Sequence, residues 1–182
     1  IYIESNSNIS LGFGCFSNTK LENVSLAGKS INIENSCFMN CTSLRGVCIK
    51  SDSEIFLGVG CFSNNTNLNN VILNGKTINL DNNCFLNCSS LNKIAIDNAI
   101  DILLGKSVFK KCSKLEQINI DANNIKIGEK CFKELNVKKV KFQGENITIR
   151  QMCFQNCSEI SEFFIIGAIN VEIGISAFEK CK

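Results

Sequence analysis

The stretch that decides the fold is residues 78–96, which read Ile78-Asn-Leu80-Asp-Asn-Asn-Cys84-Phe85-Leu-Asn-Cys88-Ser-Ser-Leu91-Asn-Lys-Ile94-Ala-Ile96. Residues 31–49 repeat this pattern position by position, as Ile31-Asn-Ile33-Glu-Asn-Ser-Cys37-Phe38-Met-Asn-Cys41-Thr-Ser-Leu44-Arg-Gly-Val47-Cys-Ile49. The Phe of the pattern recurs every 22 to 24 residues, at Phe16, Phe38, Phe62, Phe85, Phe109, Phe132, Phe154 and Phe178. A fixed period in this range is the sequence signature of a repeat solenoid. We expect these Phe residues to form one buried column in the core.

Each repeat contains two short stretches in which apolar and polar residues alternate, as in a strand with one buried face. The first is Ile/Val-x-Ile/Leu, as in residues 78–80, and the second follows Leu-x-x, as in residues 94–96. Between them lies Cys-Phe-x-x-Cys-x-x-Leu, whose spacing predicts a short helix or 3-10 turn. Stacked copies would form two parallel sheets around a common core. The predicted fold class is therefore a repeat solenoid of about eight repeats of about 23 residues, mostly parallel β with short helical or 3-10 turns.

The combined pattern, Leu-x-x-Val-x-Ile and then Ile-x-Ile-Gly-x-x-Cys/Ala-Phe-x-x-Cys, resembles the BspA-like class of leucine-rich repeats over essentially the whole chain. That class usually has Ala before the Phe. Here Ala177 keeps it, Val108 varies it, and Cys replaces it at Cys15, Cys37, Cys61, Cys84, Cys131 and Cys153. The chain also lacks the Pro that usually follows the second strand. The resemblance implies a cell-surface or secreted leucine-rich-repeat protein of bacteria or protozoa that binds extracellular matrix or host-surface proteins.

Composition excludes several classes of protein. With 45% apolar and 20% charged residues, the chain is not disordered, and no apolar run approaches the length of a membrane span. The 19 basic and 17 acidic side chains are too evenly balanced for a nucleic-acid partner. The absence of His excludes Ser-His-Asp and Cys-His catalysis and every His-containing zinc site. We therefore expect no enzyme activity, no cofactor and no insertion into a membrane.

The domain prediction is a single solenoid domain over residues 1–182. The chain has no initiating Met, signal peptide or polar terminal caps, so we expect it to be a fragment of a longer protein. Both terminal repeats would then leave strand edges and half of an apolar layer uncovered. These open ends predict end-to-end self-association of the isolated chain.

The 12 Cys residues raise the questions of metal and disulfides. A zinc site needs two Cys pairs that converge, whereas each Cys-x-x-x-Cys pair here would point into the core. Within a repeat, Cβ atoms four residues apart on a helix lie ~5–6 Å from each other, beyond the ~3.5–4.5 Å of a disulfide. We expect no metal and mostly reduced thiols that pack as small apolar groups, with cross-repeat disulfides as the alternative. Cys48 should be the exposed exception, because it lies at an outward strand position.

The candidate binding residues are the outward positions of the second strand, because a solenoid binds with the surface that its strands tile. They are Tyr2, Cys48, Ile72, Ala95, Asn119, Lys141 and Phe164. A near-constant core under a varied face is typical of a protein-binding surface, and equally of unconstrained drift. The predicted function is therefore a non-enzymatic protein-interaction module. The alternative is a structural spacer segment of a longer solenoid with no ligand of its own.

Two further patterns are ambiguous. Residues 101–141 contain ten Lys and only five acidic residues. This excess of positive charge indicates either an ordinary solvated face or a surface that attracts an acidic partner. Seven Asn-x-Ser/Thr sequences occur, at Asn8, Asn23, Asn40, Asn64, Asn87, Asn146 and Asn156. Repetition of Asn-Cys-Ser/Thr after the Phe explains much of their number, and glycosylation of a secreted chain is the other interpretation.

Overall fold

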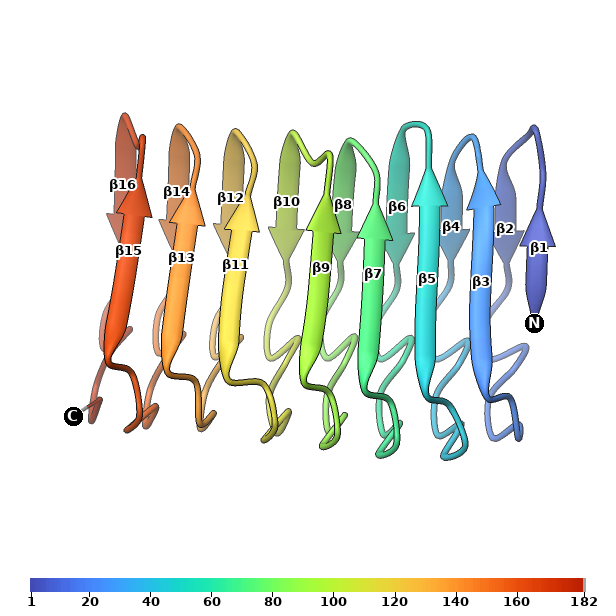
Figure 1. Ribbon diagram of the computed structural model, residues 1–182, viewed down its shortest axis with the longest axis horizontal. Coiled ribbons are helices and arrows are strands. Elements are labelled where there is room, and N and C mark those ends of the chain that lie inside the picture. The colour runs from blue at the N-terminus through green and yellow to red at the C-terminus, as the bar shows by residue number, and fades with distance from the viewer. Residues whose placement is uncertain (182) are drawn as a thin grey trace.

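The computed structural model describes residues 1–181, which form sixteen short strands and no helix (Figure 1). Lys182, the last residue of the predicted domain, lies outside the described residues. The odd-numbered strands are β1 (Tyr2–Glu4), β3 (Asn23–Gly28), β5 (Gly46–Ser51), β7 (Asn70–Asn74), β9 (Lys93–Asp97), β11 (Gln117–Asp121), β13 (Lys139–Gln143) and β15 (Glu162–Ile166). The even-numbered strands are β2 (Ile9–Leu11), β4 (Ile31–Ile33), β6 (Glu54–Leu57), β8 (Thr77–Leu80), β10 (Asp101–Leu104), β12 (Asn124–Ile127), β14 (Asn146–Ile149) and β16 (Asn170–Ile173).

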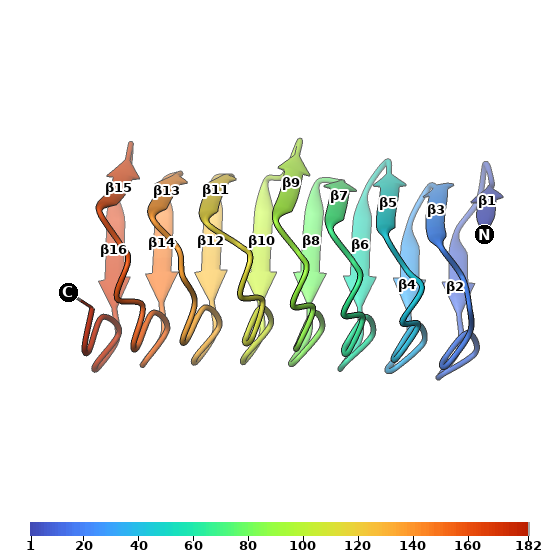
Figure 2. The ribbon, with the colours of Figure 1, turned by 60° about the horizontal axis from the view of Figure 1, so that its bottom comes forward.

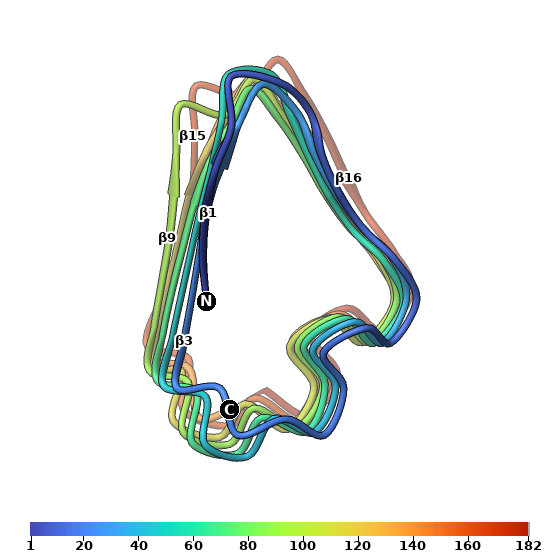
Figure 3. The ribbon, with the colours of Figure 1, turned by 90° about the vertical axis from the view of Figure 1, so that its right-hand side faces the viewer.

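All strand pairs are parallel and join equivalent strands of adjacent repeats. Val71, for example, pairs with Val47 on one side and with Ile94 on the other. The even-numbered strands form one unbroken eight-stranded sheet, which Figure 2 shows as a continuous row. Seen end-on, the coils superimpose into one outline with the two strand faces along its long sides (Figure 3). The chain is therefore a parallel β-solenoid, as its period predicts.

The segment between the two strands of a repeat forms successive turns rather than a short helix. Ser36 and Asn40 have positive φ angles of 55° and 59°, which interrupt any helical run. The N–H of Phe38 points out of its own coil and donates to the carbonyl oxygen of Cys61 at 2.8 Å, while Met39 closes a tight turn onto Ser36 at 3.1 Å. A helix would keep these N–H groups bonded within its own coil. In these turns, N–H groups such as that of Phe38 donate hydrogen bonds to the next coil instead.

Asparagine recurs in these turns because one position requires left-handed backbone. The second residue after the column Phe has φ between 59° and 63° at Asn18, Asn40, Asn64, Asn87 and Asn156. Asn adopts this region more readily than other residues with a Cβ. Neighbouring copies also bond to each other, since Asn40 Nδ2 donates to Asn18 Oδ1 at 2.6 Å. The repeated Asn-Cys-Ser/Thr therefore has a structural cause that is independent of glycosylation.

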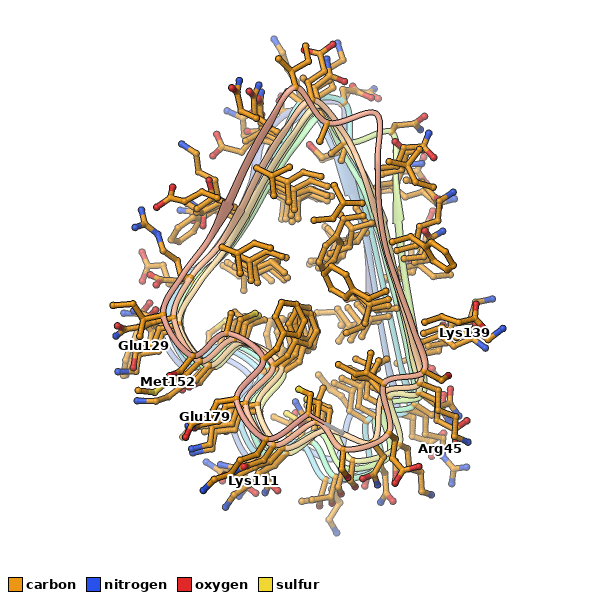
Figure 4. All side chains as sticks on the ribbon, turned by 90° about the vertical axis from the view of Figure 1, so that its left-hand side faces the viewer. Arg45, Lys111, Glu129, Lys139, Met152 and Glu179 are labelled. Carbon is orange, nitrogen blue, oxygen red and sulfur yellow. The ribbon has the colours of Figure 1, made fainter. Side chains whose placement is uncertain are left out.

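The column of eight Phe rings runs the length of the core (Figure 4). Consecutive rings stack with centroids 5.0–5.6 Å apart. This separation and their near-parallel planes are those of offset stacking. The six rings from Phe38 to Phe154 are at most 1% exposed, and the end rings Phe16 and Phe178 are half-buried. On the odd-numbered side, Phe142 of β13 and Phe163 of β15 pack against Phe154, with ring centroids 6.3 Å and 5.9 Å away.

The odd-numbered strands do not form one sheet. They divide into a five-stranded sheet from β1 to β9 and a three-stranded sheet from β11 to β15. Three residues, 98–100, connect β9 to β10, whereas two residues, 75–76, connect β7 to β8. Figure 3 shows β9 displaced outward, together with β15, whose connector 167–169 also has three residues. The inward Ile94 of β9 is half-buried, while its β7 equivalent Val71 is fully buried.

One polar side chain is completely buried in the turns. Asn65 occupies a position where several other repeats have Cys, and it is 0% exposed. Its Nδ2 donates to the carbonyl oxygens of Phe38 at 3.0 Å and Phe62 at 2.7 Å. Its Oδ1 has no hydrogen-bond partner among residues 1–181. A buried oxygen without a partner carries a desolvation cost that no bond offsets.

Truncating an interior ring of the Phe column should strongly destabilise the fold. We expect Phe85→Ala to lower the free energy of unfolding by ~3–5 kcal/mol, because it leaves a cavity between two stacked rings. The matched control is Phe164→Ala on the exposed face, which should change this free energy by less than about 1 kcal/mol. Urea unfolding of both variants measures the difference. Equal effects of the two substitutions would contradict a ring column that supports the core.

Replacing the buried Asn65 with the Cys of other repeats should stabilise the protein. Asn65→Cys keeps a donor near the turn carbonyls and removes the unpartnered oxygen, so we expect the free energy of unfolding to rise by about 1 kcal/mol. Asn65→Leu is the control, since it removes both the oxygen and the donor, and it should be less stable than Asn65→Cys. Urea unfolding under reducing conditions ranks the three proteins. A less stable Asn65→Cys protein would refute this interpretation.

Candidate functional site

Parallel register places the outward residues of the odd-numbered strands in a line, which we call the outward row. Its residues in order are Tyr2, Ser25, Cys48, Ile72, Ala95, Asn119, Lys141 and Phe164. The seven candidate binding residues thus lie on one face of the solenoid. The row is interrupted between Ala95 and Asn119, where the strands β9 and β11 do not pair.

Exposure varies along the outward row. Tyr2 is 69% exposed and Phe164 is 48% exposed, while Asn119 is also exposed. Cys48, Ile72, Ala95 and Lys141 are half-buried because neighbouring strands flank them. The middle of the row, from Cys48 to Ala95, is therefore a half-buried strip of apolar side chains. Beyond the interruption the row turns polar and ends at an exposed aromatic ring.

Ion pairs between adjacent coils neutralise part of the lysine-rich segment. Just before β13 and β11, Lys138 lies 3.1 Å from Glu116, and Lys139 of β13 lies 2.8 Å from Glu162 of β15. Figure 4 shows Lys139 projecting outward from this face. Such exposed pairs contribute little to stability. They do reduce the net positive charge that the sequence alone suggests for this face.

A second cluster of charges lies at the turns. The side chain of Glu129 accepts hydrogen bonds from Lys130 and Lys106, at 2.6 Å and 3.2 Å, and these contacts lower the pKa of Glu129 to about 2. Glu129 is thus ionised at every physiological pH. This cluster is a local charge pairing on the surface, well away from the outward row.

The opposite sheet also carries exposed apolar side chains. Leu103 on β10 is 45% exposed, and Phe56 on β6 is half-buried. Across β8, β10 and β12 the surface is hollowed by a cavity of about 410 Å³ that Leu103, Asn79 and Lys126 help to line. The even-numbered face is therefore a second surface with apolar character, and it offers a control for tests of the outward row.

The cysteines form two columns that differ in chemistry. The first column precedes the Phe and comprises Cys15, Cys37, Cys61, Cys84, Cys131 and Cys153. The second follows the Phe by three residues, and its thiols donate to the Phe carbonyl of the preceding coil. Cys88 reaches Phe62 at 3.2 Å, and Cys157 reaches Phe132 at 3.0 Å. The second-column thiols are therefore hydrogen-bond donors as well as small apolar groups, a role that the sequence pattern did not indicate.

Burial changes the acidity of individual interior thiols. Desolvation raises the pKa of Cys88 to about 12 and that of Cys157 to about 11. All 12 cysteines are free thiols in the structure. Within residues 1–181, no three His, Cys, Asp or Glu side chains cluster as metal ligands would. A protonated thiol is a poor nucleophile, so Cys88 and Cys157 should react slowly at neutral pH.

The prediction that Cys48 is the one exposed cysteine needs correction. Cys48 is half-buried, because Ser25 and Ile72 flank it in the register of the sheet. Cys15 on the first coil is the exposed cysteine, and Cys181 on the last coil is half-buried. Cys15 Sγ lies 3.3 Å from Cys37 Sγ. Position along the stack therefore affects thiol exposure as much as the direction of the side chain does.

The geometry defines the class of protein: a leucine-rich-repeat solenoid with short strands on two sides and stacked turns between them. A family model described as BspA type leucine rich repeat region matches residues 1–103 and 82–182, with six copies. The chain belongs to this BspA-type leucine-rich-repeat family. Members are commonly surface or secreted proteins, and solenoids of this kind are typically non-enzymatic. Residues 1–181 contain no helix with the length and apolarity needed to cross a membrane.

A solved structure supports the fold. The crystal structure of a leucine-rich repeat protein from Bacteroides ovatus ATCC 8483 is similar to this chain with a TM-score of 0.58 and 23% sequence identity. The similarity covers 95% of this chain and 50% of that protein, so the chain spans about half the length of the solved relative. At this identity the likeness concerns the fold alone. No curated protein matches the sequence.

Thiol labelling of the native protein should separate the cysteines by exposure. At pH 8 we expect an aromatic disulfide reagent to modify Cys15 fastest, Cys48 and Cys181 more slowly, and the buried columns only after unfolding. The physical reason is that burial both blocks access and raises the thiol pKa. Mass spectrometry of the labelled peptides identifies the modified residues. Comparable native labelling of Cys84 and Cys15 would contradict the buried columns.

Proposed function

We propose that this chain is a non-enzymatic protein-interaction module that binds a partner protein through the outward row. Membership of the leucine-rich-repeat family supports a protein-interaction or a structural role. The observation that carries the proposal is the contrast between the two sides of each odd-numbered strand. Inward residues such as Val47 and Val71 repeat with little change, whereas the outward Cys48, Ile72 and Ala95 differ at every step.

Exposed apolar side chains at the end of the row support this proposal. On β15, Phe164 and Ile166 are 48% and 43% exposed, although both lie on strands where solvent favours polar groups. Aromatic residues are enriched at protein interfaces because they bury a large area with few rotatable bonds. A row that is apolar at Ile72 and again at Phe164, with Lys141 between, suits a protein surface of mixed polarity.

The stack of coils gives this surface a fixed shape. Within each of the two odd-numbered sheets, every strand pairs with at least one neighbour, so each part of the row is presented with little freedom of the backbone. Binding to a preorganised surface costs less conformational entropy than binding to a flexible one. We propose that residues 1–182 belong to one solenoid domain. We also propose that this domain acts at the cell surface or after secretion, with extracellular matrix or host-surface proteins as its partners.

A pull-down with matched variants tests the proposal. The immobilised chain should capture a protein from solubilised host-surface and matrix material. The double variant Ile72→Asp with Phe164→Asp should lose it, because the substitutions place carboxylates in the apolar parts of the row. The control is Phe56→Asp with Leu103→Asp, which matches that pair in exposure but lies on the opposite sheet. Quantitative mass spectrometry of the captured material measures the loss.

The outcomes separate the two roles that the family allows. Capture that the outward-row variant loses and the control keeps supports an interaction module. No specific capture, or equal capture by both variants, favours a structural spacer whose exposed apolar residues have no partner. Circular dichroism and urea unfolding of each variant establish that a lost interaction does not reflect lost folding.

A further inference from the structure

Two thiols of the first cysteine column meet between the first and second coils. Cys15 Sγ lies 3.3 Å from Cys37 Sγ. Within residues 1–181, no other two thiols are in hydrogen-bonding contact, although the column contains four further cysteines. The second-column thiols turn toward carbonyl oxygens instead, as Cys41 turns toward that of Phe16 at 3.1 Å. The Cys15–Cys37 pair is therefore the place where the geometry favours a bond between two sulfurs.

The backbone on both sides of the pair is already at the separation of a disulfide. The N–H of Gly14 donates to the carbonyl oxygen of Asn35 at 3.1 Å, and that of Phe16 donates to the carbonyl oxygen of Cys37 at 2.9 Å. Backbones bonded in this way lie about 4.8 Å apart, within the ~4.4–6.8 Å that disulfides span between Cα atoms. The sulfurs must then approach from 3.3 Å to about 2.05 Å. The first coil can shift to allow this, because β1 and β2 each pair with one strand in the described part of the chain.

The two thiols differ in their access to solvent. Cys15 is exposed, whereas Cys37 is 0% exposed. Burial, together with the contact to Cys15, raises the pKa of Cys37. A small oxidant can therefore reach Cys15 directly, while Cys37 reacts with a sulfur that already lies beside it. An accessible thiol next to a second thiol is the arrangement of cysteines that oxidise reversibly to a disulfide.

We propose that Cys15 and Cys37 form a disulfide that secures the first coil, by exchange with a small-molecule disulfide such as oxidised glutathione. The Cys15 thiolate attacks one sulfur of the reagent, which forms a mixed disulfide and releases one reduced thiol. The Cys37 thiolate then attacks Cys15 Sγ, which closes the protein disulfide and releases the second reduced thiol. The two cysteines lose two electrons and two protons in all, and the reagent takes them up as two thiols.

The bond would act where the stack has least support. Phe16, the ring of the first coil, is half-buried, whereas Phe38 of the second coil is fully buried. Coils at the end of a repeat stack open more readily than interior ones, because each interior coil has two neighbours. A covalent link between the first two coils removes the states in which the first coil separates. Oxidising surroundings outside the cell favour such a link.

Mass spectrometry of the whole chain follows the two chemical steps. The reduced protein is incubated at micromolar concentration with excess oxidised glutathione, and samples are quenched in acid. We expect a one-glutathione adduct that gives way to a chain two hydrogens lighter than the reduced one. Loss of the adduct should accelerate about tenfold from pH 7 to pH 8, because the thiolate fraction of Cys37 rises with pH below its raised pKa. A chain whose thiols all stay reduced would overturn the proposal.

Matched variants identify the two sulfurs. Cys37→Ser should stop at a stable one-glutathione adduct, and Cys15→Ser should form neither species. The controls Cys41→Ser and Cys61→Ser should still form the disulfide, since neither thiol contacts Cys15. An intramolecular disulfide that survives Cys37→Ser, or a product that consists only of dimers linked through Cys15, would refute the proposal.

Hydrogen exchange measures the effect on the first coil. The amide of Phe16 should exchange at least about tenfold more slowly in the oxidised chain than in the reduced one, whereas that of Phe85, in an interior coil, should not change. Unchanged exchange at Phe16 would contradict a bond that secures the first coil. The Cys15→Ser chain should still capture its partner in the pull-down, because neither cysteine of the pair belongs to the outward row. Failure of the disulfide and failure of the proposed function are thus distinguishable.

Discussion

The structure depends on one constraint: each coil must place its strands one hydrogen-bonding distance, about 4.8 Å, from the strands of the next coil. Interior side chains then pack against the equivalent side chains of the next coil. Flat Phe rings satisfy this by offset stacking at 5.0–5.6 Å. Backbone contacts are equally close, since a Cβ added at Gly128 would lie 2.4 Å from the carbonyl oxygen of Gly105. In the turns, small Cys side chains and Asn residues with positive φ fit within the same spacing between coils.

The spacing of apolar residues predicts which side chains face inward but not the backbone that turns them. Cys-Phe-x-x-Cys-x-x-Leu buries the same residues in a helix and in successive turns, so periodicity cannot separate the two. The informative signal was the Asn two residues after the column Phe in five of the eight repeats, as at Asn40 and Asn87, because it marks left-handed backbone. The outward row followed from alternation alone. The half-burial of Cys48 did not, because it depends on the neighbours that the register supplies.

The break between β9 and β11 illustrates why one inserted residue is hard to interpret from a sequence. The apolar positions of the two strands are eight residues apart from Val47 to Ile55 and from Ile94 to Ile102. The spacing is also eight in the first and last repeats, and it is seven in the other four. In the first case β5 absorbs the extra residue and pairing continues. There, Ser51 Oγ donates to the carbonyl oxygens of Lys29 and Glu54, at 3.0 Å and 2.9 Å. Within residues 1–181, β9 and β15 have no equivalent of this contact, and both lie outward in Figure 3, yet β15 still pairs with β13. The same extra residue thus has different outcomes that the local pattern does not distinguish.

The break in one sheet and the continuity of the other have a mechanical consequence. Bending stiffness along a solenoid comes from the backbone hydrogen bonds that join its coils on every side. At the level of β10, the ladder from β8 through β12 and the bonds between turns, such as Phe109 N–H to the carbonyl oxygen of Cys131 at 3.0 Å, cross the break. Only the odd-numbered face lacks a ladder there. The solenoid is therefore most compliant at this level, in the direction that separates β9 from β11.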